Sequence, residues 1–595
     1  MIRTHTCGEL TAKDVSREAC LCGWIASRRD HGEIIFMDLR DKHGITQLVF
    51  DPEKNSEAHK KAHELRNEFC VKITGKVGKR PEGTVNPKIP TGEIEMEVRE
   101  LEVLSESLTP PFEVKDAASV SEDVRLKYRY LDLRRPDMQK KLLIKHNVYR
   151  FIMDFLDEED FLFVETPMLT KATPEGARDY LVPSRIQQGS FYALPQSPQI
   201  FKQILMVSGV EKYFQIARCF RDEDLRADRQ PEFTQLDMEM SFADQDDILG
   251  VCERLFKGLF KEIMGLDVKT PFTRLDYHEA MSKYGSDKPD TRFEVHLHDL
   301  TDDAAASEFK IFREVVSSGG RVMAIAAPGY GKISRKEIDE LTAFAAEYGA
   351  KGLAYFKVDE KEMNSPIAKF FKAETLGKFR EKTGARAGDM IFIVADTAEV
   401  AETALGGLRL RIGREKGLID EKRFDFLWVV NFPLFRFNKD ENRWVSEHHP
   451  FTGFREEDMK FLEEGELPKI RSKSYDLVLN GSEIGSGSVR IHRRDVQQKI
   501  FDALGLTKEE SEKKFGFLLD AFKYGPPPHG GIAFGIDRLI TLFTGDASIR
   551  EVIPFPKTQK GVCPLTGAPS TVDAAQLREL GIKLGKWARK EQGGE

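Results

Sequence analysis

Three separated segments combine arginines, carboxylates and glycines in a way that suits the binding of a nucleoside triphosphate. The first, FRDEDLRADRQPE (220–232), holds three arginines and five carboxylates. The second, NGSEIGSGSVRIH (480–492), separates Glu483 from Arg490 by small residues that let a ligand approach the backbone. The third, GIAFGIDRL (531–539), places Arg538 just after a glycine-flanked strand. Taken singly, each is more typical of a solvated loop or a tightly packed strand than of a ligand site.

The sequence has neither of the usual glycine loops for phosphates. No GxxxxGK[ST] stretch and no strand-linked GxGxxG occur. The seven cysteines form no CxxC pair and no cluster with histidines, which argues against structural zinc and against a disulfide framework. If ATP binds, we expect arginines and carboxylates to hold its phosphates.

Composition limits the possible partners and compartments. The first twenty residues contain no apolar core of signal-peptide length, and no run of about 18 apolar residues occurs anywhere. We therefore expect a cytoplasmic protein that neither spans a membrane nor is exported, in a reducing compartment. The net charge of −8 gives no global attraction to nucleic acid, so a polyanion would have to be bound by local basic patches.

Two alternating runs, KYFQIARCF (212–220) and FTQLDMEMSF (233–242), flank the first charged segment and predict a strand pair. In the second run the apolar side chains fall on one face of the strand. The other face carries Gln235, Asp237, Glu239 and Ser241. Such a polar face either meets water or lines a site, and the pattern alone leaves both alternatives open.

With 595 residues, the chain exceeds what one hydrophobic core supports, and a multidomain α+β fold is expected. Five short strands in 1–107 are typical of a small closed barrel such as the oligonucleotide-binding (OB) fold. A linker rich in Ser, Pro and acidic residues follows. After it, Ile144, Val148, Phe151 and Phe155 fall at helical spacing and predict an amphipathic helix, and FLFVETPML (161–169) predicts a strand closed off by Pro167. The predicted divisions are 1–107 barrel, 108–136 linker, 137–285 and 425–560 the two parts of a core, 286–424 an inserted α+β domain, and 561–595 a C-terminal extension.

Several motifs, in order along the chain, resemble those of one enzyme family. FRDE followed by GIAFGIDRL is similar to motifs 2 and 3 of the class II aminoacyl-tRNA synthetases, and FLFVETPML (161–169) to motif 1. More closely, YRYLDLRR, TKATPEGARDY, ALPQSPQ and YGPPPHGG resemble the bacterial type of aspartyl-tRNA synthetase over essentially the whole chain. The resemblance implies an N-terminal OB-fold anticodon-binding barrel, an antiparallel catalytic sheet with flanking helices, a GAD-like insertion and a homodimer.

The same resemblance implies a reaction and its nucleotide site. L-aspartate is activated with ATP to aspartyl-adenylate and transferred to the 3′ end of tRNA(Asp). Arg221 is expected at the α-phosphate and Arg538 at the γ-phosphate, as the catalytic residues, where arginine suits phosphoryl oxygens. Asp476 and Glu483 are expected to hold Mg²⁺, with no organic cofactor and no zinc. The implied ATP-binding residues are Arg221, Asp222, Glu223, Gln230, Phe233, Glu483, Gly535, Ile536, Asp537 and Arg538.

Choosing aspartate over asparagine requires a cation opposite the side-chain carboxylate, because a neutral amide would leave that cation unpaired. Arg490 and Lys202 are the expected cations. For His448 a packing role beside Pro450 is the alternative to substrate contact. The implied aspartate-binding residues are Glu175, Ser197, Gln199, Lys202, Arg221, His448 and Arg490.

In the barrel, the resemblance implies that Arg29, Phe36, Gln47 and Glu95 read the anticodon by stacking and hydrogen bonding. Without it, Phe36 would be assigned to the core. His31 and Gly83 differ from the leucine and lysine typical of the discriminating branch of the family. We therefore expect tRNA(Asn) to be aspartylated as well, which would require a separate amidotransferase to convert the product.

Other functions stay open on the sequence alone. They are a strictly tRNA(Asp)-specific aspartyl-tRNA synthetase, an asparaginyl- or lysyl-tRNA synthetase, and a non-catalytic tRNA-binding paralogue. The motif arginines and acids, which such paralogues lose, are all present here. The distal half of the first charged segment, from Asp224 to Arg229, is either a solvated face or a contact for the tRNA acceptor end.

Overall fold

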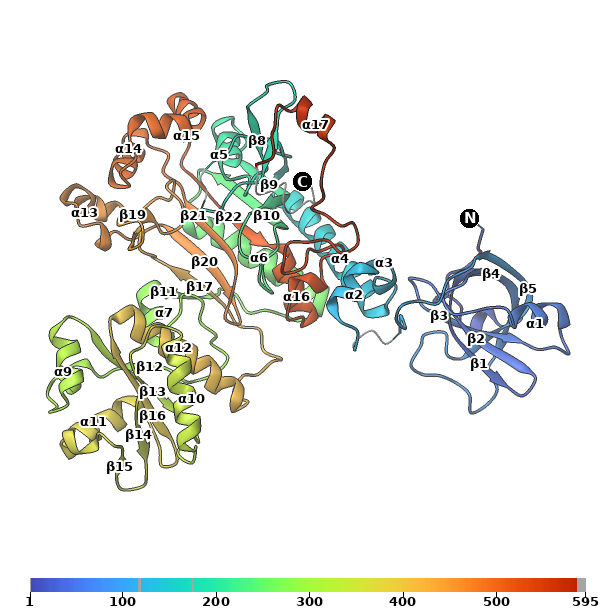
Figure 1. Cartoon of the computed structure of the whole chain (residues 1–595), viewed down its shortest axis with the longest axis horizontal. Coiled ribbons are helices and arrows are strands. Elements are labelled where there is room, and N and C mark those ends of the chain that lie inside the picture. Colours follow the sequence, from blue (N-terminus) through green and yellow to red (C-terminus); the bar gives the residue numbers. More distant parts are fainter. Residues whose placement is uncertain (1, 116–118, 174–175, 586–595) are drawn as a thin grey trace. The chain divides into compact units, whose positions relative to one another are not determined.

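The N-terminal residues form a closed five-stranded barrel in the computed structural model of the chain (Figure 1), as the spacing of apolar runs predicts. Around the barrel the order is β1 (Glu18–His31), β2 (Ile34–Arg40), β3 (Ile45–Phe50), β5 (Ile94–Ser105) and β4 (Cys70–Lys79), with α1 (Ser56–Ala62) between β3 and β4. Only β3 and β5 pair in parallel. Alternate side chains fill the interior, among them the fully buried Leu21, Ile73 and Met96.

The structure describes residues 2–115, 119–173 and 176–585. The chain packs as two compact units, which are described separately. Unit 1 is Met1–Asn147, Asp224–Pro231 and Ile540–Leu577, and unit 2 is Val148–Glu223, Glu232–Leu539 and Arg578–Glu595. Unit 1 holds the barrel together with α2 (Glu122–Lys127) and α3 (Arg129–Asp132).

An eight-stranded sheet is the centre of unit 2. Its order is β11 (Thr273–Asp276), β17 (Phe426–Val430), β20 (Ser474–Leu479), β21 (Ser482–Val489), β22 (His529–Gly535), β10 (Glu232–Ser241), β9 (Lys212–Phe220) and β6 (Leu162–Phe163). The six central strands are antiparallel, which confirms the predicted antiparallel sheet, whereas β11 and β6 add in parallel at its two edges. The motif FLFVETPML contributes only the two residues of β6, so its strand is much shorter than its apolar pattern predicts.

Helices cover the sheet and carry apolar stripes onto it. On α6 (Gln245–Met264), Phe256 and Phe260 contact Phe426 of β17, with ring centroids 5.7 and 5.0 Å apart. The predicted amphipathic helix is α4 (Pro136–Glu158). The other helices of this region are α5 (Gln199–Val207), α7 (Tyr277–Tyr284), α13 (Met459–Glu464), α14 (Arg494–Ala503), α15 (Lys508–Ala521) and α16 (Ile536–Thr544).

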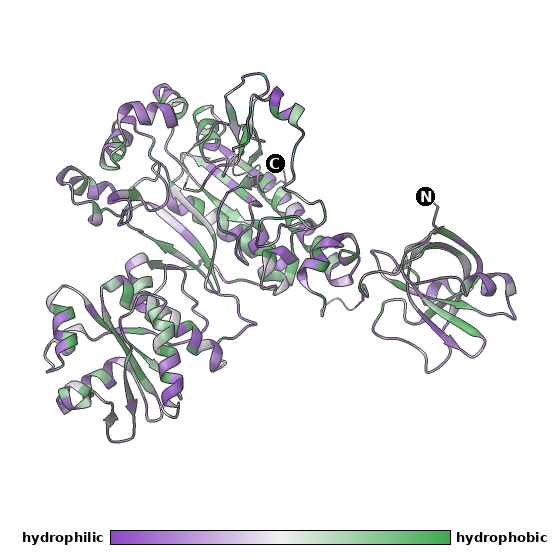
Figure 2. Ribbon diagram, viewed as in Figure 1, coloured by the Kyte–Doolittle hydropathy of each residue, from purple (hydrophilic) through white to green (hydrophobic). Residues whose placement is uncertain are grey.

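A second α+β module lies within unit 2, where the sequence texture changes. Its antiparallel sheet has the order β12 (Leu297–Asp299), β13 (Arg321–Ala327), β16 (Met390–Asp396), β14 (Ala354–Val358) and β15 (Met363–Asn364). Its helices are α8 (Thr301–Ala305), α9 (Lys310–Ser317), α10 (Arg335–Ala346), α11 (Ala373–Thr383) and α12 (Ala398–Glu415). Two separate apolar cores occupy the two faces of the sheet, and Figure 2 shows its strands as largely hydrophobic.

Two short hairpins and a terminal helix complete the elements. They are β7 (Leu181–Pro183) with β8 (Phe191–Ala193), β18 (Phe435–Asn438) with β19 (Arg443–Ser446), and α17 (Ala574–Glu579). Among the described residues, no helix is both long enough and apolar enough to cross a bilayer.

Candidate active site

The polar face of β10 is buried in unit 2. Asp237 and Glu239 are 1% and 0% exposed. Glu239 pairs with Gly531 of β22, where a Cβ atom would lie 2.0 Å from a Glu239 carboxylate oxygen, so only glycine fits at this position. Buried carboxylates need partners. Of the two alternatives for this strand, the structure therefore supports the one in which its polar face lines a site.

Lys202 on α5 and Arg490, directly after β21, are the cations that pair with these carboxylates. Lys202 Nζ lies 3.1 Å from Asp237 Oδ1 and 3.4 Å from Glu239 Oε2. Arg490 donates from Nε (2.9 Å) and from Nη2 (3.1 Å) to the two oxygens of Glu239, a bidentate arrangement. Two positive and two negative side chains thus form a balanced, buried cluster at the base of the site.

Burial and neighbouring charges shift the pKa values of Asp237 and Glu239 in opposite directions. Burial raises the pKa of Asp237, and the attraction of Lys202 offsets this only in part. Burial would also raise the pKa of Glu239, but the Arg490 and Lys202 cations more than offset it and hold that pKa below its ordinary value. Asp237 Oδ2 is buried and has no hydrogen-bond partner within the described part of the chain. Asp237 therefore retains an oxygen for a further donor.

The hydrogen bonds of Arg490 leave room for one more acceptor. Its Nη1 atom donates to Ser488 Oγ (2.6 Å) and to His449 Nε2 (2.7 Å). Together with the two bonds to Glu239, these use four of the five guanidinium N–H groups. Within the described residues, one Nη2 N–H is left for a ligand, and a carboxylate oxygen is the acceptor that suits it best.

His449 is held neutral and fixes the Arg490 side chain. Both ring nitrogens face N–H donors, because Phe451 N lies 3.2 Å from Nδ1 and Arg490 Nη1 lies 2.7 Å from Nε2. Neutral imidazole has a single acceptor nitrogen, and the shorter, charge-assisted contact at Nε2 is the stronger one. Burial, reinforced by the Arg490 charge, lowers the pKa of His449 well below its usual value. The imidazole therefore acts as an acceptor that orients the guanidinium.

A second cluster gathers Asp476 of β20, Glu483 of β21, His448 and Arg538. His448 Nε2 lies 3.6 Å from Asp476 Oδ1, and the Asp476 carboxylate raises the pKa of His448 despite its burial. The His448 ring also packs edge-on against Phe432, with centroids 4.9 Å apart, so it has a packing role as well. Arg538, on the first turn of α16, donates from Nη1 to the backbone oxygen of Glu483 (2.5 Å).

Asp476 and Glu483 fit a hard divalent cation. Burial, and then the Asp476 charge, raise the pKa of Glu483, which is the effect of a second carboxylate close by. Asp476 Oδ1 is buried and makes no hydrogen bond with any described residue. His448 approaches that oxygen only to 3.6 Å, so a cation between the two carboxylates would relieve their repulsion and could coordinate the oxygen directly. Mg²⁺ prefers oxygen ligands. The described residues contain no group of three or more His, Cys, Asp and Glu side chains that could hold a metal.

The predicted nucleotide residues lie at the adjoining ends of β9 and β10. Arg221 directly follows β9, and its guanidinium carbon lies 5.1 Å from the centre of the Phe233 ring on β10. Asp222 forms a long ion pair with Arg178, with 3.8 Å between Oδ2 and Nε. Asp537 is buried, and its Oδ2 accepts a hydrogen bond from Thr234 N (3.0 Å). Asp537 therefore fixes the start of α16 onto β10 and acts on the site by placing Arg538.

The remaining predicted residues are distributed as follows. Ser197 Oγ accepts a hydrogen bond from Gln199 N (3.3 Å) at the start of α5, and the buried Gln199 Nε2 has no partner among the described residues. Ile536 is fully buried next to Gly535 at the end of β22. Glu175 lies outside the described residues. Gln230 belongs to unit 1, together with the rest of 224–231, whereas Glu223 belongs to unit 2.

The predicted site residues did not include four side chains that organise the site, although two of them lie on the polar strand face that the sequence left open as a site lining. Asp237, Glu239 and His449 hold the two cations. Gln196 donates to Asp179 and to the carbonyl of Ala177 and accepts from the amide of Ala177, directly after Gly176. The alternating pattern of β10 contained the signal for the two acids. No signal in the sequence marked His449, because the adjacent His448 is the same residue type and only the folded structure gives the two rings different surroundings.

The barrel brings four of the six predicted anticodon residues together. Arg29 Nη2 donates to Gln47 Oε1 (3.3 Å), and Gln47 Nε2 donates to Glu95 Oε2 (2.9 Å). Phe36 faces Arg29 in the β1–β2 register and is partly exposed. A residue that was not predicted, Asp38, pairs with Arg29 at 3.1 Å.

His31 and Gly83, the two residues predicted to relax the choice of tRNA, lie elsewhere on the barrel. His31 is the last residue of β1 and is exposed. Gly83 has a φ of +83° in the loop after β4, a conformation that favours glycine. A lysine at this position would be strained in the present loop.

Comparison with known proteins gives the following relationships. The family model described as "tRNA synthetases class II (D, K and N)" matches residues 121–559, and the model "OB-fold nucleic acid binding domain" matches residues 19–104. A protein of Desulfatibacillum aliphaticivorans named aspartate–tRNA(Asp/Asn) ligase is 54% identical over 587 residues, covering 98% of each chain. One of Moorella thermoacetica with the same name is 55% identical over 581 residues, covering 98% of this chain and 96% of its own.

Solved structures share the fold at low identity. Asparaginyl-tRNA synthetase from Pyrococcus horikoshii, complexed with asparaginyl-adenylate, superposes with a TM-score of 0.59 at 19% identity, covering 94% of this chain and 99% of its own. An aspartyl-tRNA synthetase from Leishmania major Friedlin, described as putative in its name, gives 0.58 at 20% identity, covering 93% and 94%. These structural likenesses, together with the match of residues 19–104 to the OB-fold family, confirm the predicted fold class.

Proposed function

Since the chain belongs to the class II tRNA synthetases (D, K and N), we propose that it is an aspartate–tRNA ligase that uses both tRNA(Asp) and tRNA(Asn). The observation that carries the proposal is the buried cluster in which Glu239 and His449 hold Arg490 with one N–H group left for a ligand. Its support from relatives is the name of the proteins that are 54–55% identical over nearly the whole chain.

In this proposal the site selects aspartate by charge. The side-chain carboxylate of aspartate accepts from Arg490 and Lys202, which are already fixed by Glu239 and Asp237. Asparagine would present an amide N–H₂ group to these donors and leave part of the cationic cluster unpaired. Glu175, Ser197, Gln199 and His448 complete the proposed aspartate site.

Activation then requires the α-phosphate of ATP to meet the α-carboxylate of aspartate. Arg221 binds the α-phosphate and Arg538 the γ-phosphate, and the adenine stacks on Phe233. Asp222, Glu223, Gln230 and the segment 535–537 border the nucleotide. No side-chain nucleophile is needed, because positioning and charge stabilisation account for the rate enhancement.

Asp476 and Glu483 would hold Mg²⁺. When bound, the ion neutralises phosphate charge and orients the triphosphate. The protein's part is to hold the two carboxylates close together, where a bound cation would favour the charged form of both. His448 supports this by its ion pair with Asp476.

We further propose roles for the divisions of the chain. The barrel (1–107) binds the anticodon through Arg29, Phe36, Gln47 and Glu95, with His31 and Gly83 tolerating either tRNA. The linker (108–136) follows, the segments 137–285 and 425–560 form the catalytic core, and 286–424 and 561–595 are the inserted domain and the C-terminal extension. The reaction would take place in the cytoplasm, and an amidotransferase would convert the Asp-tRNA(Asn) product.

A homodimer is part of the proposal. Its support is a run of exposed apolar side chains on and directly after the edge strand β6 of unit 2: Leu162 (57%), Phe163 (39%), Met168 (38%) and Leu169 (53%). An unpaired edge strand beside exposed apolar side chains is typical of a surface that another chain covers.

ATP–pyrophosphate exchange with aspartate, asparagine or lysine, followed by charging of purified tRNA(Asp) and tRNA(Asn), tests the function. Aspartate should support exchange at least about a hundredfold faster than the other two. Both tRNAs should then be charged, at rates within about tenfold of each other. Exchange with asparagine or lysine instead would overturn the amino-acid assignment. Charging of tRNA(Asn) thousands of times slower than tRNA(Asp) would make the enzyme tRNA(Asp)-specific, and tRNA binding without exchange would identify a non-catalytic paralogue.

A further inference from the structure

The loop 224–231 is held in unit 1 by the segment 548–557, through five hydrogen bonds. Ser548 Oγ and Ile549 N both donate to Ala227 O (3.0 Å each). Gln230 makes a two-point contact with the Lys557 backbone, since its Nε2 donates to Lys557 O (3.0 Å) and its Oε1 accepts from Lys557 N (2.8 Å). The fifth bond runs from Arg550 Nη1 to the carbonyl of Arg226 (3.3 Å). The loop is therefore anchored at both ends by another part of the chain.

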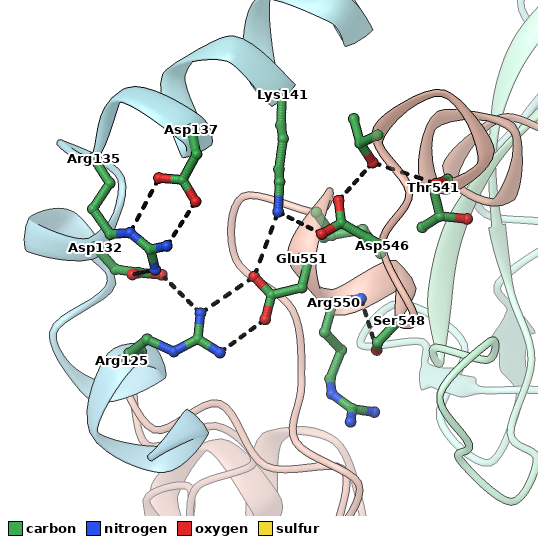
Figure 3. Close-up of polar contacts among 12 residues, drawn as sticks. Arg125, Asp132, Arg135, Asp137, Lys141, Thr541, Asp546, Ser548, Arg550 and Glu551 are labelled. Carbon is green, nitrogen blue, oxygen red and sulfur yellow. Dashed lines mark hydrogen bonds and ion pairs between the residues drawn. The ribbon is translucent and has the colours of Figure 1, made fainter. Parts of the chain in front are cut away.

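The longer segment 546–557, which contains these residues, is in turn fixed to the helices after the barrel (Figure 3). Arg125 of α2 donates bidentately to Glu551 (2.8 and 3.2 Å), and Lys141 of α4 pairs with Asp546 (2.7 Å). Arg129 of α3 is 2% exposed and donates to the backbone oxygens of residues 550, 553 and 554. Burial of these pairs makes their loss costly. The segment 546–557 is thus a rigid strip between the linker helices and the loop.

Among the contacts just described, the Arg550 side chain bonds both to a helix after the barrel and to the loop 224–231. Its Nε donates to Glu122 of α2 (2.6 Å), while its Nη1 donates to Arg226 O in the loop. A planar guanidinium can bridge two acceptors in fixed directions, which a lysine ammonium cannot reproduce. Arg550 has only 12% of its side chain exposed, whereas Glu122 is 37% exposed and the bond to Arg226 O lies at the surface, so water competes in part for both bonds.

We propose that the Glu122–Arg550 pair is a positioning device that preorganises the loop 224–231 for the acceptor end of tRNA. The inference rests on the proposed function. Arg226 and Arg229 are exposed on this loop, where they suit phosphates, and the loop continues without a break into Glu223 and Glu232. A loop that is already ordered does not pay its ordering entropy when the RNA binds.

The variants Glu122→Gln, Arg550→Lys and Arg550→Met test this inference, with Asp137→Asn as the matched control. Asp137 pairs with Arg135 in the same group of helices and does not touch the strip. We expect the KM for tRNA(Asp) to rise about threefold for Glu122→Gln and about tenfold for Arg550→Met, with Arg550→Lys between them. The KM values for ATP and aspartate in tRNA-independent exchange should change less than about twofold, as should every constant of the control.

Hydrogen–deuterium exchange of the intact protein supplies a readout independent of activity. Peptides covering 224–231 should exchange faster in Glu122→Gln and Arg550→Met, while peptides from β9 and β10 stay unchanged. Unchanged hydrogen–deuterium exchange of the loop together with an unchanged KM for tRNA would overturn the inference. A rise confined to the KM for ATP would overturn it as well. A wild-type protein without aspartate-dependent ATP–pyrophosphate exchange would instead overturn the proposed function. The hydrogen–deuterium exchange of the loop would still report on the Glu122–Arg550 pair.

Discussion

Two arginine–carboxylate pairs, one in the catalytic sheet and one on the barrel, differ in their exposure to water and in how they are hydrogen-bonded. Arg490 and Glu239 have side chains that are 2% and 0% exposed and meet through two hydrogen bonds. Arg29 and Asp38 are 59% and 22% exposed and meet through one. The first pair is proposed to select a small carboxylate, and the second borders a surface proposed to read bases.

The difference lies in what water can replace. In the sheet, water is excluded, so an unpaired charge has no alternative partner and a wrong ligand is rejected strongly. On the barrel, water can take over any contact that is lost, so each pair adds little and recognition is spread over several side chains. Selectivity for the amino acid should therefore depend on single residues, and affinity for tRNA on many.

Arg490→Met should have the largest effect. It leaves Glu239 buried without its main partner, at a cost of about 3–5 kcal/mol. Aspartate-dependent exchange should fall by at least about a thousandfold, and the thermal unfolding midpoint should drop. Steady-state exchange kinetics and calorimetry measure the two effects.

Two further variants separate folding from recognition at this pair. Adding Glu239→Gln to Arg490→Met should restore much of the thermal stability without restoring exchange, since the unpaired charge is gone but the ligand's cation is still missing. Arg493→Gln is the control, because the Arg493–Asp495 pair is exposed on both sides and should leave exchange within about twofold. Full activity in Arg490→Met would refute the assignment of this arginine.

His449 offers an intermediate effect. His449→Phe removes the acceptor at Nε2 and leaves an Arg490 N–H unsatisfied, so the KM for aspartate should rise about tenfold. His449→Gln can place an amide oxygen near the Nε2 position and should recover most of this loss. If the phenylalanine and glutamine variants behave alike, the imidazole contributes only packing.

The smallest effect is expected on the barrel. Asp38→Asn weakens the contact that holds Arg29 and should raise the Kd for tRNA(Asp) by no more than about threefold, because exposed pairs contribute below about 1 kcal/mol. Amino-acid activation should be unchanged. Filter binding at two salt concentrations measures the effect, and a loss above about thirtyfold would place Asp38 in direct contact with the RNA.

Local patterns predicted the elements well and their packing less well. The apolar spacing in α4 predicts a helix with Ile144, Val148, Phe151 and Phe155 on its inner face. The residues that are fully buried are Val148, Ile152 and Leu156, because neighbouring elements rather than the helix itself choose the inner side. The strand at 161–169 was predicted too long, since an apolar run does not show how much of it finds a pairing partner.

The sequence by itself determined the barrel and the antiparallel sheet, and its motifs supplied most of the residues that we propose for the site. These follow from periodicity and from residue types that act locally. Only the tertiary structure decided that Asp237 and Glu239 are buried, that His449 rather than His448 orients Arg490, and that Arg550 connects Glu122 with the loop 224–231. The physical reason is that burial and charge pairing depend on residues 35 to more than 400 positions apart, whose proximity no local pattern records.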